Sequence, residues 1–267
     1  MLGYGSDVAV TSSTFTIPAG TVAAIIGPNG SGKSTMLNAI AGLVEPQSGT
    51  LDVPARNAPG HRIAYVLQTT KVNDALPITV GEVVAMARYS GLGFYQSLGQ
   101  DDREAVAVAM ERVGITAMAN KHLHELSGGQ RQRVFVAQGL AQEHDILMLD
   151  EPLTGIDLPT AQAIDAVIHD ERSRGCTVIM TTHDLSEAQV ADHVVMMSGR
   201  VVASGKPDEV LTTENLVTAY GPSLLHIGDG TIFIDDPAHV PVVGRQVHQQ
   251  RVIHTDPLPS DVHHDDV

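Results

Sequence analysis

The sequence contains the stretch Gly27-Pro28-Asn29-Gly30-Ser31-Gly32-Lys33-Ser34-Thr35, which follows the apolar run 22–26 and precedes the run 36–40. A glycine, four further residues and Gly-Lys-Ser, between a buried strand and a helix, form the pattern of a phosphate-binding loop. The glycines let main-chain N–H groups turn inward and, with the helix N-terminus, surround a polyphosphate. Lys33 supplies a cation for the β- and γ-phosphates, and Ser34 a hydroxyl for Mg²⁺. A coincidental glycine-rich turn is the alternative.

Composition sets the class of protein. With 43% hydrophobic and 18% charged residues among 267, the chain reads as a soluble globular protein with one good core. Its single cysteine, Cys176, excludes an internal disulfide and a four-cysteine zinc site, which favours the cytosol. The apolar runs are too short to span a bilayer, and a formal charge of −15 argues against general attachment to nucleic acid or anionic lipid. A membrane role would therefore require a protein partner.

The remaining elements follow from apolar periodicity. Short strands are predicted at 15–17, 21–26, 50–53 and 62–67, and the character changes to helical between Leu76 and Leu126. Within that region, Asp101 and Glu104 are expected to cap a helix over 105–113.

Three polar or aromatic side chains outside the loop are candidates for ligand contacts. Tyr4 could stack on an adenine ring, although ordinary strand packing is the simpler explanation. Gln68 follows a strand and could offer its carbonyl oxygen to a metal or to water, or be a plain loop residue. Ser127 can cap a helix over 131–141, and the two glycines after it expose N–H groups to an anion, although such a turn is common.

Two more candidates follow buried strands. The apolar run 146–149 ends in Asp150 and Glu151, where ligands of α/β sheets bind. One carboxylate could hold Mg²⁺ through water while the other polarises an attacking water; a salt-bridged acidic turn is the alternative. His183 ends the strand 177–182, beside the expected γ-phosphate, unless it is an ordinary core histidine.

Together these motifs resemble the ATP-binding subunits of ABC transporters, from Tyr4 to about Gly221. The resemblance covers the Walker A loop 27–35, Gln68 of the Q-loop, the signature Leu126-Ser127-Gly128-Gly129-Gln130, the Walker B strand 146–150 with Glu151, the D-loop ending in Asp157, and the switch histidine His183. It implies an α/β P-loop cassette over residues 1–221, with a mainly parallel core sheet, an antiparallel β subdomain and a helical insertion at about 76–126.

The resemblance also implies a role for each motif. Tyr4 would stack on the adenine of ATP, and Lys33 and the loop amides would hold its phosphates. Ser34, Gln68 and Asp150 would bind Mg²⁺ directly or through water. Glu151 would act on the attacking water, and His183 would sense the γ-phosphate. Ser127 and Gly129 would face the nucleotide of an opposite subunit, so a chain with one copy of each motif is expected to form an ATP-dependent homodimer.

Shorter sequence segments imply the transporter subgroup and the partners of the chain. Pro77-Ile78-Thr79-Val80, Phe94-Tyr95 and the segment 151–157 are similar to ATPases of zinc, manganese and iron importers. Siderophore and haem importers share much of this, and a soluble ABC ATPase of iron–sulfur cluster assembly is a further alternative. The importer resemblance implies integral-membrane permease subunits, a solute-binding protein and a place on the inner face of the membrane. The apolar loop 91–95 is expected to touch a partner.

The last part of the chain extends past the resemblance. Residues 222–267 are predicted to form a hairpin over 224–234 and then a disordered tail. This extension holds six histidines, His226, His239, His248, His254, His263 and His264. It could bind the transported metal, but ligand spacing is not compact and the histidines could be incidental. At the other end, only three residues precede Tyr4, so we expect either an incomplete edge of the β subdomain or a true start upstream.

Overall fold

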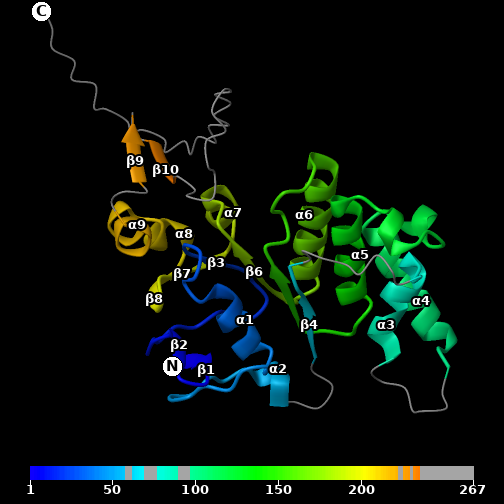
Figure 1. Ribbon diagram of the computed structural model, residues 1–267, viewed down its shortest axis with the longest axis horizontal. Helices are drawn as coiled ribbons and strands as arrows, with labels where there is room; N and C mark the ends of the chain where they lie inside the picture. The colour runs from blue at the N-terminus through cyan, green and yellow to red at the C-terminus, as the bar shows by residue number, and fades with distance from the viewer. Residues whose placement is uncertain (58–61, 69–76, 90–96, 222–224, 229–230, 235–267) are drawn as a thin grey trace, which may run out of the picture.

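The computed structural model describes residues 1–57, 62–68, 77–89, 97–221, 225–228 and 231–234. Its centre is a sheet in the order β4-β5-β6-β3-β7-β8. The strands are β3 (Val22–Ile26), β4 (Ile63–Val66), β5 (Ile146–Asp150), β6 (Thr177–Thr182), β7 (His193–Met197) and β8 (Val201–Gly205). All neighbours are parallel except β7 and β8. This arrangement confirms the predicted α/β class (Figure 1).

Both faces of the sheet are covered, which explains why its central strands are continuous apolar runs. Every residue of β3 and β6 is buried. On one face, Ile25, Met148 and Ile179 pack in a cluster with α1 (Lys33–Ile40) and with residues of β1 (Leu2–Tyr4) and β2 (Asp7–Val10). On the other face, Ile26, Leu149 and Met180 pack with α5 (Gly128–Leu140) and α6 (Leu158–Ser173). The loop before α1 and the start of α5 therefore belong to layers on opposite faces.

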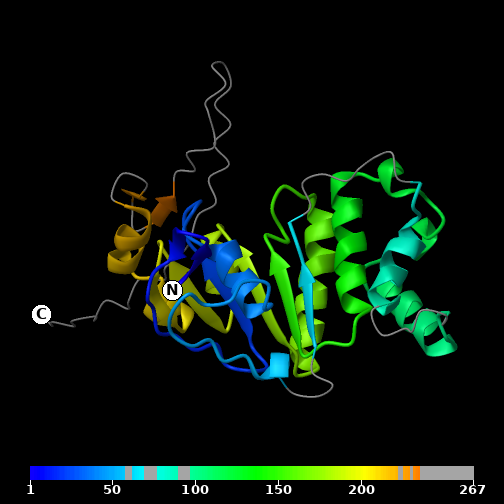
Figure 2. The same cartoon turned by 60° about the horizontal axis from the view of Figure 1, so that its bottom comes forward.

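A group of helices lies beyond α5 (Figure 2). It contains α3 (Val80–Tyr89), α4 (Gln100–Arg112) and the 3-10 turns η1 (Thr116–Met118) and η2 (Leu123–Glu125). Arg88 ties the group together, because its Nε lies 2.8 Å from Asp102 on α4 and its Nη1 donates to the Ala141 carbonyl at 3.2 Å. The described residues of this segment, 77–89 and 97–126, are thus mainly helical.

The other elements are short. They are α2 (Pro54–Asn57), α7 (Leu185–Gln189), α8 (Pro207–Val210), α9 (Thr213–Tyr220), β9 (Leu225–Gly228) and β10 (Thr231–Ile234). β9 and β10 pair antiparallel, which confirms the predicted hairpin. β1 and β2 form a separate two-stranded antiparallel sheet in which β1 has three residues. None of the helices in the described ranges combines the length and apolar character needed to cross a bilayer.

Two predicted strands are wrong. Segment 50–53 is not a strand, because the Val53 carbonyl already accepts the Arg56 N–H in the turn that begins α2 at Pro54. Segment 15–17 is also irregular, and its apolar alternation reflects packing of Phe15 and Ile17 against the α1 cluster.

The predicted start of α4 is also wrong. The helix begins at Gln100, five residues earlier than expected, because Asp102 rather than Glu104 reaches back to the chain before the helix. Asp102 Oδ2 accepts the Gly99 N–H at 2.9 Å while Oδ1 pairs with Arg88.

Candidate functional site

Two positions in the loop between β3 and α1 have a backbone conformation and surroundings that only glycine suits. Gly27 has φ 152°, and a Cβ there would collide with the Met197 carbonyl oxygen. Gly32 stands immediately before α1 in the left-handed region, with φ 96°, and a Cβ there would lie 2.5 Å from Val10. No side chain caps α1, and its first turn carries no acidic residue. The N–H groups at this helix start, and its positive dipole end, are therefore available to an anion.

Lys33 is folded back over this loop. Its side-chain Nζ donates to the carbonyls of Gly27 at 2.9 Å and Pro28 at 3.3 Å. Burial lowers the pKa of Lys33, while the charges of Glu151 and Asp150 act in the opposite direction. A buried ammonium thus lies within electrostatic reach of both carboxylates. Ser31 is also buried in the loop, and its hydroxyl has no hydrogen-bond partner among the described residues. Ser34 and Asn29 are exposed.

The two carboxylates are organised by Thr181 of β6. Asp150 pairs with Thr181 in the sheet register, and the Thr181 hydroxyl donates to Asp150 Oδ1 at 2.5 Å. The same hydroxyl accepts the Glu151 main-chain N–H at 2.9 Å. Glu151 is the one non-glycine residue in the described chain with positive φ, at 48°. This conformation costs about 1 kcal/mol for a residue with a Cβ, so the surrounding bonds hold Glu151 in a strained position.

Gln68 reaches Glu151 from the next strand. After β4, its Nε2 donates to Glu151 Oε2 at 2.9 Å. The neighbouring Tyr65 has its hydroxyl buried without a partner among the described residues. Burial, and then the charge of Asp150, raise the pKa of Tyr65. Gln68 and Glu151 are therefore in contact at the edge where β4 and β5 end.

The turn before α5 lies on the other face of the sheet. Ser127 caps α5: its Oγ accepts the Gln130 N–H at 3.3 Å, and its own N–H donates to Gln130 Oε1 at 3.0 Å. Gly128 and Gly129 open the helix. A Cβ on Gly129 would lie 2.9 Å from both Asp157 Oδ1 and Thr160 Oγ1, so the start of α5 packs against the start of α6. Hydrogen bonding to Thr160 lowers the pKa of Asp157.

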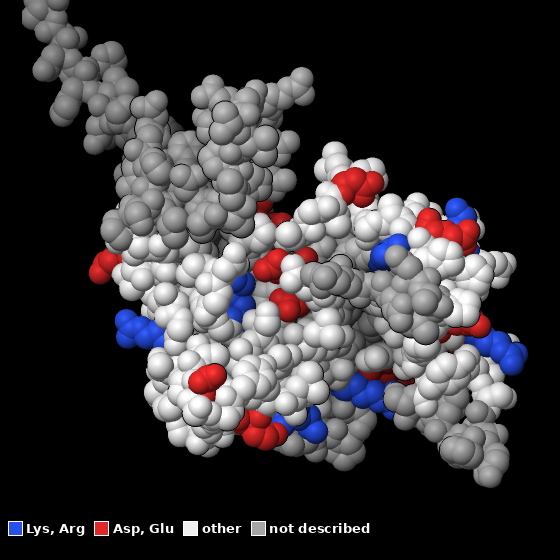
Figure 3. Space-filling model, in the orientation of Figure 1, with Lys and Arg blue, Asp and Glu red and all other residues white. Residues whose placement is uncertain are grey.

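Tyr4 contacts α1, and His183 lies at the end of β6. The Tyr4 ring is 54% exposed, and its hydroxyl accepts from Asn38 Nδ2 on α1 at 2.9 Å. His183 directly follows β6 and is exposed. The face of the molecule in Figure 3 carries interspersed acidic and basic side chains rather than one basic patch. Predictions for the loop 91–95 and for the tail beyond residue 234 lie outside the described residues.

Known proteins share this arrangement. The family model "ABC transporter" matches residues 10–154. The chelated iron transport system membrane protein YfeB of Yersinia pestis is 39% identical over 234 residues, covering 85% of this chain and 79% of the relative. The zinc transport system ATP-binding protein TroB of Treponema pallidum is 41% identical over 208 residues, covering 77% of this chain and 78% of the relative. The chain belongs to the ATP-binding subunits of ABC transporters.

A solved structure of the family shows the same fold. The dimeric structure of a bacterial ABC transporter cassette has a TM-score of 0.64 and 28% identity, covering 74% of this chain and 90% of that one. This ABC cassette is therefore an ATPase subunit with the α/β fold that the sequence predicts.

The residues of the ABC cassette fit ATP and a hard cation. The uncapped start of α1 and the buried ammonium of Lys33 suit a polyphosphate. Hydroxyl, amide and carboxylate oxygens at Ser34, Gln68 and Asp150 are the donor types that Mg²⁺ prefers. Thr181 was missed by the sequence reasoning, because a threonine inside an apolar strand has no pattern that marks its hydrogen bonds. Asn38 was missed for the same reason, since no pattern marks its amide as a hydrogen-bond donor to the Tyr4 hydroxyl.

Proposed function

We propose that this ABC ATPase energises the import of a divalent metal ion, manganese, zinc or iron, and works on the cytoplasmic face of the membrane. The observation that carries the proposal is the identity of 39–41% with iron- and zinc-transport proteins over more than three quarters of the chain. The importer-like phrases in the sequence point the same way. Permease subunits and a solute-binding protein would complete the transporter.

The site residues are proposed to divide the hydrolytic work. Lys33 would neutralise phosphate charge, and Ser34, Gln68 and Asp150 would hold Mg²⁺, which supplies further neutralisation when it is bound. Glu151 would accept the proton of the attacking water, and its bond to Gln68 would orient the carboxylate. His183 would contact the γ-phosphate, and Tyr4 would stack on adenine. Asp157 would contribute from the start of α6.

A second copy is proposed to complete the pocket. α1 and α5 pack on opposite faces of the sheet, so the loop 27–35 and the Ser127 turn of one chain belong to different layers. Ser127, Gly128, Gly129 and Gln130 of one copy would therefore close over the nucleotide held by the other. The dimeric structure of a similar cassette supports a homodimer.

The permease contact is proposed to lie on the helical group. Met86 and Tyr89 on α3 are 47% and 52% exposed, which leaves apolar surface available to a protein partner. No lipid insertion is required for such a contact.

Cellular uptake tests the proposal. Cells lacking the gene would be complemented with the wild-type chain or with Glu151→Gln, and uptake of Mn²⁺, Zn²⁺, Fe²⁺ and siderophore-bound iron would be measured. We expect the wild type alone to restore uptake of at least one free ion. If the wild-type chain restored only the uptake of siderophore-bound iron, the proposed cargo class would be contradicted. If cells lacking the gene showed normal uptake but reduced iron–sulfur enzyme activity, a transport role would be contradicted.

A further inference from the structure

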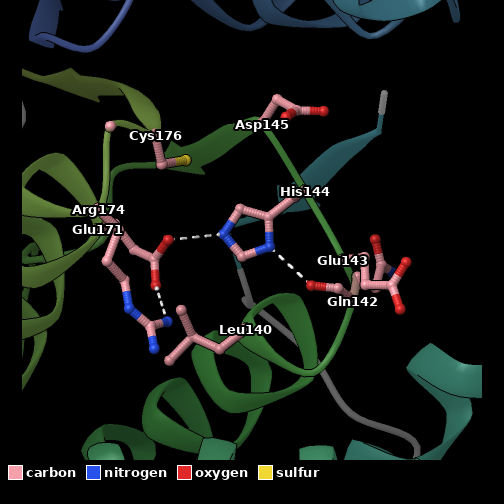
Figure 4. A pocket seen from close by; sticks show the side chains of 9 residues that line it. Leu140, Gln142, Glu143, His144, Asp145, Glu171, Arg174 and Cys176 are labelled. Carbon is pink, nitrogen blue, oxygen red and sulfur yellow. Dashed lines mark hydrogen bonds and ion pairs between the residues drawn. The ribbon is translucent and has the colours of Figure 1, made fainter. Parts of the chain in front are cut away.

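A buried polar cluster lies at the opposite end of the sheet from the nucleotide site. It is formed by the segment between α5 and β5, the last turn of α6 and the turn between α6 and β6, next to the amino ends of β5 and β6. Five-residue strands place it about 17 Å from Asp150. The cluster opens into a hollow of about 450 Å³, shown in Figure 4. None of the residues assigned to ATP hydrolysis lines this hollow.

Three side chains of metal-ligand type converge there. One ligand atom each from His144, Glu171 and Cys176 lie within 4.8 Å of one another. The His144 and Glu171 side chains are 5% and 4% exposed, and Cys176 is 6% exposed. Imidazole, carboxylate and thiolate are the three ligand types that Zn²⁺ uses, and three protein ligands leave a fourth position for water.

The His144 ring is oriented as metal-binding histidines are. Its Nδ1 lies 2.7 Å from the Gln142 carbonyl, which can only accept, so Nδ1 carries a proton. Nε2 then faces Glu171 Oε2 at 3.1 Å. In Figure 4 the ring lies between these two partners. A carbonyl that fixes the ring through one nitrogen, and so presents the other, is the usual second contact of a histidine ligand.

Two arginines orient the Glu171 carboxylate. Its Oε1 lies 2.6 Å from Arg112 Nη1 and 3.5 Å from Arg174 Nη1, which leaves Oε2 directed at His144. Glu143 and Asp145 also line the hollow. Burial alone would lower the pKa of His144, but hydrogen bonds with Cys176 and Glu171 outweigh it and raise the pKa to about 10. The histidine ring is therefore paired with the carboxylate.

We propose that His144 Nε2, Glu171 Oε2 and Cys176 Sγ form a binding site for one Zn²⁺ ion. Zinc binds a neutral imidazole and a thiolate, so binding at these atoms would release protons to solvent. Ligands about 2.0–2.3 Å from a tetrahedral zinc are roughly 3.5 Å apart. The most widely separated ligand atoms, within 4.8 Å, need to approach by about 1 Å, whereas His144 Nε2 and Glu171 Oε2, at 3.1 Å, need to move slightly apart.

Cobalt provides a spectroscopic test on the full chain. Cys176 is the one cysteine in the sequence, so a thiolate-to-cobalt charge-transfer band can report this site alone, whatever the tail histidines bind. Reduced, metal-free protein titrated with Co²⁺ should develop the band to about one equivalent, and Zn²⁺ should abolish it. Titration with Zn²⁺ in two buffers of different ionisation enthalpy should show that protons are released on binding.

Variants separate a metal site from a buried ion pair. His144→Gln should weaken cobalt binding by about tenfold or more, as loss of a ligand or its support does. Glu143→Gln, in the same hollow but outside the ligand set, should leave binding unchanged. ATP binding by each variant reports that it is folded. Absence of the band in the wild type, or an unchanged band in His144→Gln, would overturn the proposal without bearing on transport.

Discussion

Replacing Thr181 with valine tests how the carboxylates of Asp150 and Glu151 are positioned. Valine keeps the shape of threonine and its preference for strands, but removes the hydroxyl that joins Asp150 to the Glu151 main chain. Thr181 is fully buried, so water cannot easily replace these bonds. A lost hydrogen bond to a carboxylate and an orphaned buried N–H together cost roughly 2–4 kcal/mol.

The substitution should also affect hydrolysis itself. Without the Thr181 bond, Glu151 can leave its strained backbone conformation, and its carboxylate would then be misplaced for the attacking water. We expect kcat for ATP hydrolysis to fall about tenfold or more, equivalent to about 1.4 kcal/mol of barrier, while ATP affinity stays within a few-fold.

The matched control is Thr177→Val on the same strand. Thr177 Oγ1 accepts the Gly20 N–H at 2.9 Å, but at the far end of β6 from the carboxylates. Urea denaturation should show both variants destabilised, whereas steady-state ATPase assays should show kcat reduced in Thr181→Val alone. Equal kcat in the two variants, or full activity in Thr181→Val, would refute the positioning argument.

Three other perturbations have defined outcomes. Gly27→Ala, which places a Cβ against a main-chain carbonyl, should abolish ATP binding in a nucleotide-binding assay, whereas Gly30→Ala, with open space around it, should retain measurable binding. The pair of His144 (pKa raised from 6.5 to about 10) and Glu171 (pKa lowered from 4.5 to about 2) stabilises the fold fully between about pH 4.5 and 6.5. Its histidine contribution is lost as pH rises toward 10 and its glutamate contribution as pH falls toward 2. In metal-free urea titrations, the stability difference between wild type and His144→Gln should therefore shrink from pH 6 to pH 9, and a constant difference would contradict the assigned pKa values. Arg88→Gln should cost about 1–3 kcal/mol in the same assay, because a largely buried guanidinium that links α3 to α4 is lost; a change below 0.5 kcal/mol, roughly the size of an ordinary surface substitution, would show the link to be dispensable.

The sequence predicts structure well where the residue types of a segment match the backbone and burial that the fold requires there. The loop 27–35 and the acidic end of β5 are marked by residue types that their backbone and position require, so both were predicted from the chain alone. The strand predicted at 15–17 was wrong because alternation of apolar residues cannot distinguish sheet pairing from packing against a cluster. The start of α4 was wrong because Asp102 is recruited by Arg88, a partner 14 residues away that a local capping pattern does not contain.

Long-range polar contacts account for what the sequence left out. Thr181 meets Asp150 across 31 residues, and His144 meets Glu171 across 27. Neither pair has a spacing that predicts contact, since the sheet order that joins them is a property of the whole fold. The positions of the motifs on opposite faces of the sheet likewise became visible only with the topology.

The mass of Glu151→Gln in solution tests the central claim most directly. With hydrolysis blocked, ATP and Mg²⁺ should shift the protein, measured by light scattering, from 28.2 kDa to twice that mass. Adding Ser127→Asp should prevent the shift, because aspartate still caps α5 but sets a negative charge against the phosphates of the other copy. Ser127→Asn, a neutral cap, is the control and should still dimerise. A Glu151→Gln chain that binds ATP and yet stays at 28.2 kDa would contradict a nucleotide pocket shared between two copies.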